Sequence, residues 1–403
     1  MMPLSNIRVI DAASIMAGPL IATHLGDFGA DVIKIEHPQK GDNSRSLSLK
    51  KDGVPLMWKW LSRNKRTMSL NLKESFDQEI FLELVKTADI LIENFRPGTL
   101  EKWGLDYDML SKLNPGLILI RVTGYGQTGP YSNRPGFGTI AEAMSGLAHM
   151  TGFPDGPPVL PTFGLADSIT SLNGVFAAMI ALYNRDINNG KGQVIDLSIV
   201  DSMFAILGSQ ATDYDSLGKI HERTGNRVPF SAPRNLYKTR DNKYVCLSGS
   251  AQSITERIFR IIGREDMIND PKFAKNDDRL KNVDELDEII GDWMIQRDQA
   301  DIIAIFAEEE AALGPIYDIS DIFKDPHFIE RELIVRVPDE ELGSVKMQNI
   351  VPRLSETPGR IRFPGKTQGA DNESILHELG FSDEQINRFL KSRNLEIGIK
   401  PPR

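Results

Sequence analysis

Residues 7–36 read IRVIDAASIMAGPLIATHLGDFGADVIKIE, and this stretch decides the fold class. The apolar run at 7–11 predicts a β-strand. Gly18-Pro19 predicts the first turn of a helix, because proline lacks the backbone N–H that would have no partner there. Gly29 ends that helix, and the apolar run at 32–36 predicts the next strand. A strand, a helix and a second strand with short connections indicate two parallel strands.

The same alternation continues along the chain. The sequence predicts further strands at 67–72, 90–92, 117–122 and 194–197. It predicts further helices at 75–87, at 168–183 and from about residue 200. We therefore expect an α/β protein whose parallel sheet is covered by helices on both faces. Ligands bind to such sheets beyond the carboxyl ends of the strands.

Two regions depart from this alternation. Residues 124–164 are rich in glycine and proline and hold one predicted helix at 139–149, which indicates a long functional loop. Residues 225–325 begin with a strand at 244–247 and continue as amphipathic helices rich in Asp and Glu, which indicates a separate unit.

The length of the chain bears on its domain organisation. A chain of 403 residues is too long for one ordinary core, so two domains are expected. We place a large domain at 1–220, a small domain at 225–325 and a C-terminal segment at 330–403. This last segment holds short β segments and a final helix at about 383–391.

Composition excludes several classes of protein. The net charge of −9 argues against a general binder of nucleic acid or anionic membranes. The apolar stretches are short and interrupted, so we expect no transmembrane helix. The N-terminus lacks a basic segment followed by an apolar block, so we expect no signal peptide and a cytoplasmic protein. One cysteine, Cys246, excludes an internal disulfide, and we expect it to be a buried strand residue. The six histidines show no metal-ligand spacing, so no metal site is expected.

Charge is unevenly distributed. Residues 34–73 hold ten Lys or Arg and three acidic residues, which gives that segment +7 and the rest of the chain −16. A local basic patch on an acidic protein suggests a small polyanionic ligand, and a solvated basic surface is the alternative.

The stretch Gly124-Tyr125-Gly126-Gln127-Thr128-Gly129 matches the dinucleotide motif G-x-G-x-x-G directly after a predicted strand. That motif must open a helix whose N-terminus holds the pyrophosphate. Residues 130–135 read PYSNRP, in which no helix can start cleanly. A flexible glycine loop is therefore favoured over a nicotinamide dehydrogenase.

Asp167 joins the glycine-rich region to the long predicted helix. Aspartate is a preferred N-cap, because its carboxylate accepts the free N–H groups of the first helical turn. The same N–H groups would keep the carboxylate ionised at the edge of a loop, as a nucleophile requires. The sequence supports both a capping and a catalytic role.

Several segments together resemble the class III CoA-transferase family, which comprises formyl-CoA transferases, carnitine CoA-transferases and α-methylacyl-CoA racemases. The segments that carry the resemblance occur in family order across nearly the whole chain. They are residues 17–19, 29–36, 64–66, 88–98, 124–126, 151–152, 164–167, 190–193 and 314–315.

The resemblance implies a Rossmann-like large domain formed from both ends of the chain, a smaller α+β domain and an interlocked homodimer. It implies that Asp167 is the catalytic nucleophile. It also implies contacts with coenzyme A in or beside the basic segment. These contacts are Met16, Ala17, His37, Leu70, Asn71, Leu72, Lys73, Asn94, Phe95, Arg96, Lys102 and Phe137.

The reaction implied by the resemblance is CoA transfer from an acyl-CoA to a carboxylic acid, through an aspartyl anhydride and an aspartyl-CoA thioester. Acyl-CoA and small carboxylic acids are then the substrates, and no permanently bound cofactor or metal is expected. Thioester exchange is nearly isoenergetic, so no ATP is required. The glycine loop would exclude water from the reactive anhydride.

The chain also departs from its relatives. The racemases have a histidine and an acid where this chain has Phe137-Gly138, and a racemase needs such a base. Formyl-CoA transferases have glutamine in place of Met16 and arginine in place of His37. These differences speak against oxalate–formate exchange. An α-methylacyl-CoA racemase or isomerase is the alternative, and a CoA-binding protein without activity is a further one.

Overall fold

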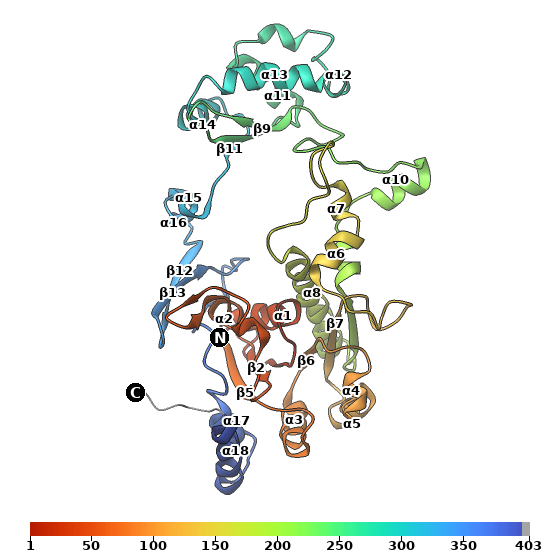
Figure 1. Cartoon of the computed structure of the whole chain (residues 1–403), viewed down its shortest axis with the longest axis vertical. Coiled ribbons are helices and arrows are strands. Elements are labelled where there is room, and N and C mark those ends of the chain that lie inside the picture. Colours follow the sequence, from red (N-terminus) through yellow and green to blue (C-terminus); the bar gives the residue numbers. More distant parts are fainter. Residues whose placement is uncertain (397–403) are drawn as a thin grey trace. The chain divides into compact units, whose positions relative to one another are not determined.

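The computed structural model describes residues 1–396. The chain forms two compact units, each of which is described by itself. Unit 1 comprises residues 1–147, 160–208 and 330–403, and unit 2 comprises residues 148–159 and 209–329. The ribbon in Figure 1 follows the chain through these segments. Compared with the ranges predicted from the sequence, residues 148–159 and 209–220 lie with unit 2 rather than with the large domain.

Unit 1 is built on a six-stranded sheet in the order β5-β2-β1-β6-β7-β8, and all its strands are parallel. The strands are β1 Arg8–Asp11, β2 Asp31–Glu36, β5 Lys65–Ser69, β6 Ile90–Glu93, β7 Ile118–Thr123 and β8 Val194–Ser198. Numbered within this sheet, the order is 3-2-1-4-5-6, which is the Rossmann order. The order reverses between β1 and β6, and the crevice at that point is where such folds bind ligands. The prediction of a parallel α/β sheet is confirmed.

Helices cover both faces of the sheet because alternate strand residues point to opposite faces. Val9 packs in one apolar core, and its neighbour Ile10 packs in the other. The core that contains Val9 also holds residues of α1 Ala17–Asp27, α6 Gly138–Met144, α8 Leu165–Ile187 and α9 Ile199–Ala205. The opposite core holds residues of α3 Ser75–Thr87, α4 Thr99–Lys102, α5 Tyr107–Leu113, α17 Asn372–Glu378 and α18 Asp383–Glu396.

The C-terminal segment completes unit 1, as the resemblance implied. The side chain of Asp371 accepts a 2.9 Å hydrogen bond from the N–H of Thr67 in β5, and Asn372 accepts one from Ser69 at the same distance. Arg393 in α18 binds the buried Asp77 of α3 at 2.5 Å. The remaining elements of unit 1 are short. They are η1 Asn43–Arg45, β3 Lys50–Lys51, β4 Val54–Pro55, α2 Leu56–Leu61, β12 Ile334–Asp339 and β13 Gly343–Gln348.

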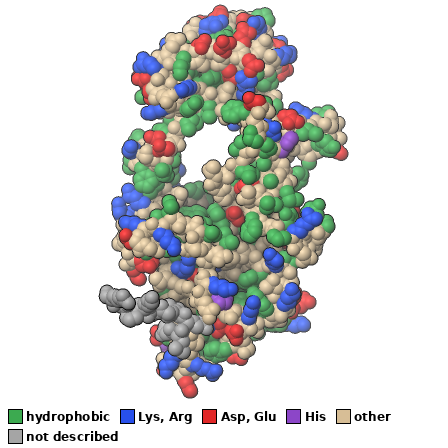
Figure 2. All heavy atoms as spheres, in the orientation of Figure 1, with side chains coloured by type: hydrophobic (Ala, Val, Ile, Leu, Met, Phe, Trp, Pro, Cys, Tyr) green, Lys and Arg blue, Asp and Glu red, His purple; other side chains and the backbone are tan. Residues whose placement is uncertain are grey.

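Unit 2 is an α+β unit with its own core. An antiparallel sheet in the order β11-β10-β9 packs against helices. Its strands are β9 Arg234–Lys238, β10 Tyr244–Ser248 and β11 Leu313–Pro315. Its helices are α10 Gln210–Leu217, α11 Gln252–Ile261, η2 Glu265–Ile268, α12 Asn276–Lys281, α13 Val283–Met294, α14 Gln299–Glu308, α15 Ile319–Ile322 and α16 Pro326–Glu330. On the face seen in Figure 2, Lys and Arg side chains alternate with Asp and Glu and form no single basic patch.

Cys246 corrects one prediction. It is exposed, whereas Val245 and Leu247 on either side of it are fully buried. β10 is half-buried, so every second side chain points away from the core. The apolar residues on either side of Cys246 therefore did not indicate that Cys246 itself is buried.

Two helices differ from their predicted bounds. The helix predicted at 139–149 is broken into α6 and α7 Leu147–Met150, because Gly146 between them has a φ of 102°.

The helix predicted at 168–183 spans Leu165–Ile187. This longer α8 has an 18-residue window of mean hydropathy 1.5, so by length and composition it could cross a membrane, contrary to the expectation from the sequence. In the structure it packs on α1, α9 and the sheet.

Candidate active site at the switch point of the sheet

A cavity of about 200 Å³ lies in the crevice where the strand order reverses. Its wall includes two connections. One is the turn from β1 to α1, residues 12–16, here called the β1 turn. The other is the segment between β7 and α6, residues 124–137, here called the β7 loop. The predicted site residues in this wall are Met16, Ala17, Asn94, Phe95, Arg96, Phe137 and Asp167.

Asp167 is the third residue of α8, and the N-cap of that helix is Gly164. The prediction that Asp167 caps the helix is therefore wrong in position. Its carboxylate accepts hydrogen bonds from the backbone N–H of Asp167 itself and from that of Ala17, at the start of α1. The first turn of one helix thus presents the carboxylate, and the first residue of a second helix donates a hydrogen bond to it.

Two glycines leave room for this carboxylate. A Cβ at Gly138 would lie 2.6 Å from Oδ2 of Asp167. A Cβ at Gly164 would lie 2.6 Å from Sδ of Met16 and 3.4 Å from the same Oδ2. The two distances of 2.6 Å leave no room for a methyl group, so a side chain at position 138 would displace Asp167 and one at position 164 would displace Met16.

The electrostatics favour a nucleophilic carboxylate. Burial raises the pKa of Asp167, and the nearby negative charge of Glu142 raises it further. The N–H groups of Ala17 and Asp167 oppose this rise but do not cancel it. Glu142 lies in α6, is 3% exposed and accepts a 3.2 Å hydrogen bond from the N–H of Ala166. A raised pKa means a more basic and hence more nucleophilic carboxylate, provided that it is ionised.

Arg96 and Arg134 bring positive charge to the same cavity. Both are exposed. The guanidinium carbon of Arg134 lies 3.7 Å from the centre of the Tyr131 ring. Among the residues that line this cavity, Asp167 is the one acid, and histidine is not among them. The lining thus offers a carboxylate for chemistry and two guanidinium groups for binding anions.

A second cavity, of about 170 Å³, adjoins the first, because Ser14 and Phe95 line both. Its wall contains His37, Leu70, Asn71, Leu72 and Lys73. The two cavities together contain every predicted CoA contact except Lys102, which lies in α4 beside the lining residue Trp103. The predicted CoA contacts in these walls come from five separate segments of the sequence, and the fold gathers them around two adjoining cavities.

The basic segment is less available than its charge suggested. Six of its ten cations form ion pairs inside unit 1. They are Lys34, Arg45, Lys59, Arg63, Lys65 and Arg66. The other four, Lys40, Lys50, Lys51 and Lys73, are exposed. Lys73 is the one that lines the second cavity, so a polyanion would meet this lysine rather than a patch of +7.

Other features of the sequence are also clear in the structure. After Gly129 the chain forms a turn, and the next helix begins only at Gly138, so the glycine motif does not open a helix as a dinucleotide site requires. Within residues 1–396, no group of three or more His, Cys, Asp or Glu is placed to hold a metal ion.

Sequence reasoning missed Glu142 and the polar side chains that bind the β1 turn. Glu142 lies one helical turn after Gly138, so both face the same side of α6. Once Asp167 was a candidate, this spacing could have pointed to Glu142 as a nearby acid, because position 138 itself is a glycine. The partners of the β1 turn lie 27 and 80 residues away in the sequence and left no local signal.

Comparisons with known proteins show the family to which the chain is similar. Residues 4–372 match the model of CoA-transferase family III. The chain is 41% identical to the beta subunit of succinyl-CoA–L-malate CoA-transferase of Chloroflexus aurantiacus, over 97% of this chain and 98% of that protein. It is 40% identical to succinyl-CoA–D-citramalate CoA-transferase of the same organism, over 95% of this chain and 96% of that protein. A CaiB/BaiF family protein from Brucella suis has a similar structure, with a TM-score of 0.84 and 31% identity over 94% of this chain and 99% of that one.

Proposed function

The chain belongs to CoA-transferase family III, and from this premise we propose that Asp167 is the residue that carries the acyl group and then the CoA. As a member of the family it is an acyl-CoA:carboxylate CoA-transferase, and CoA thioesters are its substrates. The observation that carries the proposal is the position of the Asp167 carboxylate. Six of the twelve predicted CoA contacts line the same cavity as this carboxylate, and five more line the adjoining cavity.

The first half-reaction loads the enzyme. An oxygen of the Asp167 carboxylate attacks the thioester carbonyl, the C–S bond breaks and CoA leaves as the thiolate. The product is a mixed anhydride between Asp167 and the donor acid. The thiolate then attacks the Asp167 carbonyl, the anhydride C–O bond breaks, and the donor acid leaves as a carboxylate. Asp167 is now a thioester of CoA.

The second half-reaction repeats these steps in reverse order. The acceptor carboxylate attacks the Asp167 thioester and expels the thiolate, which gives a second anhydride. The thiolate attacks the acceptor carbonyl of that anhydride, and Asp167 returns as a free carboxylate. No proton or electron is gained or lost, so neither a metal nor a redox group is needed. The N–H of Ala17 is placed to stabilise the oxyanion that forms on Asp167 during thiolate attack.

We further propose that the substrates are dicarboxylic acids. A dicarboxylic acid bound to CoA through one carboxyl group keeps the other as a free anion, and Arg96 and Arg134 line the cavity that holds Asp167. The two relatives compared above are named for succinyl-CoA with malate or citramalate, and succinate, malate and citramalate are all dicarboxylic acids. Arg134→Met should raise KM for a dicarboxylic donor by about tenfold and leave that for acetyl-CoA unchanged. Equal changes for both donors would contradict this assignment.

We also propose that the enzyme is a homodimer. The exposed face of α8 carries apolar side chains at helical spacing. They are Leu172, Phe176, Met179, Ile180, Tyr183 and Ile187. A stripe of this kind on a water-exposed helix is typical of an interface. Sedimentation equilibrium that found only a monomer at micromolar concentration would exclude the dimer.

The proposed nucleophile can be tested by intact-protein mass spectrometry after mixing the enzyme with succinyl-CoA, other acyl-CoA donors or CoA alone. We expect a hydroxylamine-sensitive CoA adduct on Asp167 when the wild-type enzyme is mixed with an acyl-CoA donor, and none with CoA alone or in Asp167→Asn. Asp186→Asn, in the same helix but at its exposed end, is the matched control and should form the adduct normally. Deuterium exchange at the α-carbon of a donor without any adduct would instead support the racemase alternative.

A further inference from the structure

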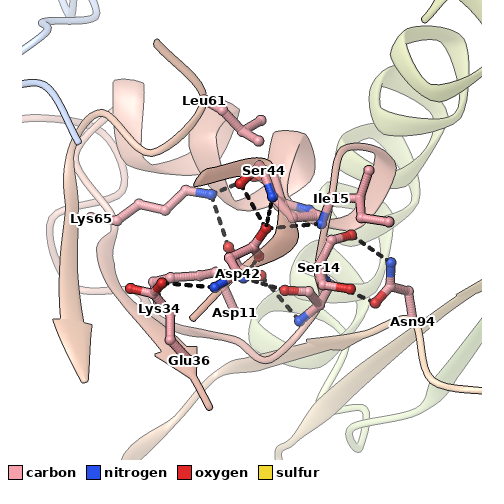
Figure 3. A network of polar contacts seen from close by, with 12 residues as sticks. Asp11, Ser14, Ile15, Lys34, Glu36, Asp42, Ser44, Leu61, Lys65 and Asn94 are labelled. Carbon is pink, nitrogen blue, oxygen red and sulfur yellow. Dashed lines mark hydrogen bonds and ion pairs between the residues drawn. The ribbon is translucent and has the colours of Figure 1, made fainter. Parts of the chain in front are cut away.

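The β1 turn is held by polar side chains from outside it (Figure 3). The side-chain amide of Asn94, directly after β6, bonds both backbone groups of Ser14. Its Oδ1 accepts the N–H of Ser14 at 2.8 Å, and its Nδ2 donates to the C=O of Ser14 at 2.7 Å. Asp42 accepts the N–H of the next residue, Ile15, at 3.3 Å. Consecutive residues of this turn are therefore fixed from two different elements.

A network of buried charged side chains holds Asp42 and the backbone on either side of the β1 turn in place. Lys34 of β2 binds Asp42 at 2.9 Å and also donates to the C=O of Ala13. Lys65 of β5 binds Asp11 at 2.8 Å and the C=O of Pro19 at 2.7 Å. These four charged side chains are at most 4% exposed, and their charges balance. Burial alone would raise the pKa of Asp42, but Lys34 and the bonds from Ser44 lower it to about 2.

The backbone of the turn would not adopt this conformation on its own. Ile15 has a φ of 72°, in the left-handed region that β-branched residues avoid. Such a conformation persists only where the surrounding structure enforces it, and it is found most often at active sites. Two residues later, the N–H of Ala17 bonds the carboxylate of Asp167. The strained residue therefore sets the direction in which α1 starts.

We propose that Asn94 and Asp42 are positioning residues for the transfer reaction, because they hold the β1 turn in the conformation that points the N–H of Ala17 at Asp167. This inference rests on the function proposed above. It also assigns the side chain of Asn94 a role in addition to the CoA contact expected from the sequence, since its Oδ1 and one N–H of its amide both bond Ser14.

The turn also lies where the two halves of the sheet meet. Asn94 follows β6, and Ser14 follows β1, so their two bonds cross the point at which the strand order reverses. A bond between the halves at this point fixes the width of the crevice, and not only the turn. Replacing Asn94 should therefore disturb the reaction geometry more than replacing a residue elsewhere in unit 1 that contributes equally to stability.

The experiment compares Asn94→Ala with Asn114→Ala. Asn114 is a matched control, because its Nδ2 donates to two backbone carbonyls and its Oδ1 accepts a backbone N–H, and it lines neither cavity. We expect Asn94→Ala to slow the single-turnover acylation of Asp167 by roughly 10- to 100-fold, since small misplacements of reacting groups cost this much. Its Kd for CoA, measured by calorimetry, should change by less than about twofold. Asn114→Ala should lower Tm similarly and leave the acylation rate unchanged.

A second pair of variants keeps the test decisive if Asn94→Ala does not fold. Asp42→Asn and Asp42→Ala both remove the charge that faces Lys34, but only the asparagine still offers an oxygen to the N–H of Ile15. We expect acylation to be about tenfold faster in Asp42→Asn than in Asp42→Ala. Hydrogen exchange of the peptide that spans residues 12–18 should be faster in Asn94→Ala and Asp42→Ala than in the wild type.

Three results would overturn the proposal. They are an Asn94→Ala variant that binds CoA weakly but acylates at the normal rate, equal acylation in the Asn94 and Asn114 variants, and equal acylation in the two Asp42 variants. If the wild-type enzyme itself forms no adduct on Asp167, the proposed function fails instead, and that outcome is read before any variant is compared.

Discussion

The β1 turn and the β7 loop line the same cavity but are built in opposite ways. In the β1 turn, Ser14 and Ile15 bond buried or half-buried side chains from elsewhere in unit 1. The β7 loop is largely exposed over residues 128–135, and it forms local hydrogen bonds there, such as that from the N–H of Arg134 to the carbonyl of Tyr131. Its ends meet closely, since a Cβ at Gly124 would lie 2.6 Å from Cα of Gly136.

This difference separates two tasks that one active site must perform. A donor to a developing oxyanion must already be in place before the reaction, and the β1 turn provides a fixed N–H at Ala17. A substrate as large as an acyl-CoA must enter and leave, and water must be excluded while the anhydride exists. A loop that is tied at both ends and free in the middle is suited to that second task.

The largest expected effect is a difference in stability between a variant that weakens the support of the β1 turn and a variant in the β7 loop. Lys65→Met leaves Asp11 with a weaker partner in a fully buried site, and should lower the free energy of unfolding by about 3–5 kcal/mol. Arg134→Met, in the β7 loop, should change it by no more than about 0.5 kcal/mol. Chemical denaturation followed by circular dichroism measures both. Similar losses in the two variants would mean that the segments do not differ in the way described.

The next effect concerns Gly138, which directly follows the β7 loop and lies beside Asp167. Gly138→Ala places a methyl group 2.6 Å from Oδ2 of Asp167, so acylation should slow by about 100-fold. Gly291→Ala, in α13 of unit 2, is the matched control, because the added Cβ would lie 3.8 Å from its nearest neighbour, Cδ1 of Tyr237. It should leave the rate unchanged and stabilise the helix by roughly 0.5–1 kcal/mol. A normal rate in Gly138→Ala would show that the loop and α6 yield easily around Asp167.

The smallest effect is a shift in pH dependence. Asp167 attacks as a carboxylate, so the acylation rate should fall as the pH decreases through its raised pKa. Glu142→Gln removes a negative charge that raises this pKa, so the pKa should fall and the acid limb of the rate profile should move to lower pH. Glu83→Gln, an exposed acid paired with Lys86, should leave the profile in place. A shift to higher pH in Glu142→Gln would contradict the assigned interaction.

The strands and helices of unit 1 were largely predictable because their signals are local. The apolar runs around Val9, Val32 and Ile118 are buried on both faces and bounded by glycine or polar residues. The helix predicted at 75–87 has the observed bounds of α3. Asp167 and the expected CoA contacts were proposed from ordered motifs, which also depend on short stretches of sequence.

What could not be predicted depends on partners far away in the chain. Lys34 and Lys65 counted toward a basic patch, because nothing near them indicates that Asp42 and Asp11 neutralise them in the core. For the same reason, the bonds between Asn94 and Ser14 could not be predicted. Glu142 approaches Asp167 only because α6 packs on α8. Tertiary contacts, rather than local propensity, decide the role of each of these residues.

The bond between Thr67 and Asp371 joins residues 304 positions apart. A ribosome therefore releases all the strands of the large sheet, and then all of unit 2, before the helices α17 and α18 that cover one face of that sheet exist. Until then, the apolar side chains that later contact Ile375, Leu376, Ile386 and Phe389 lack this cover. Completion of unit 1 must follow the synthesis of α17 and α18, and a chain that stops before them would expose an apolar surface to the cell's chaperones and proteases.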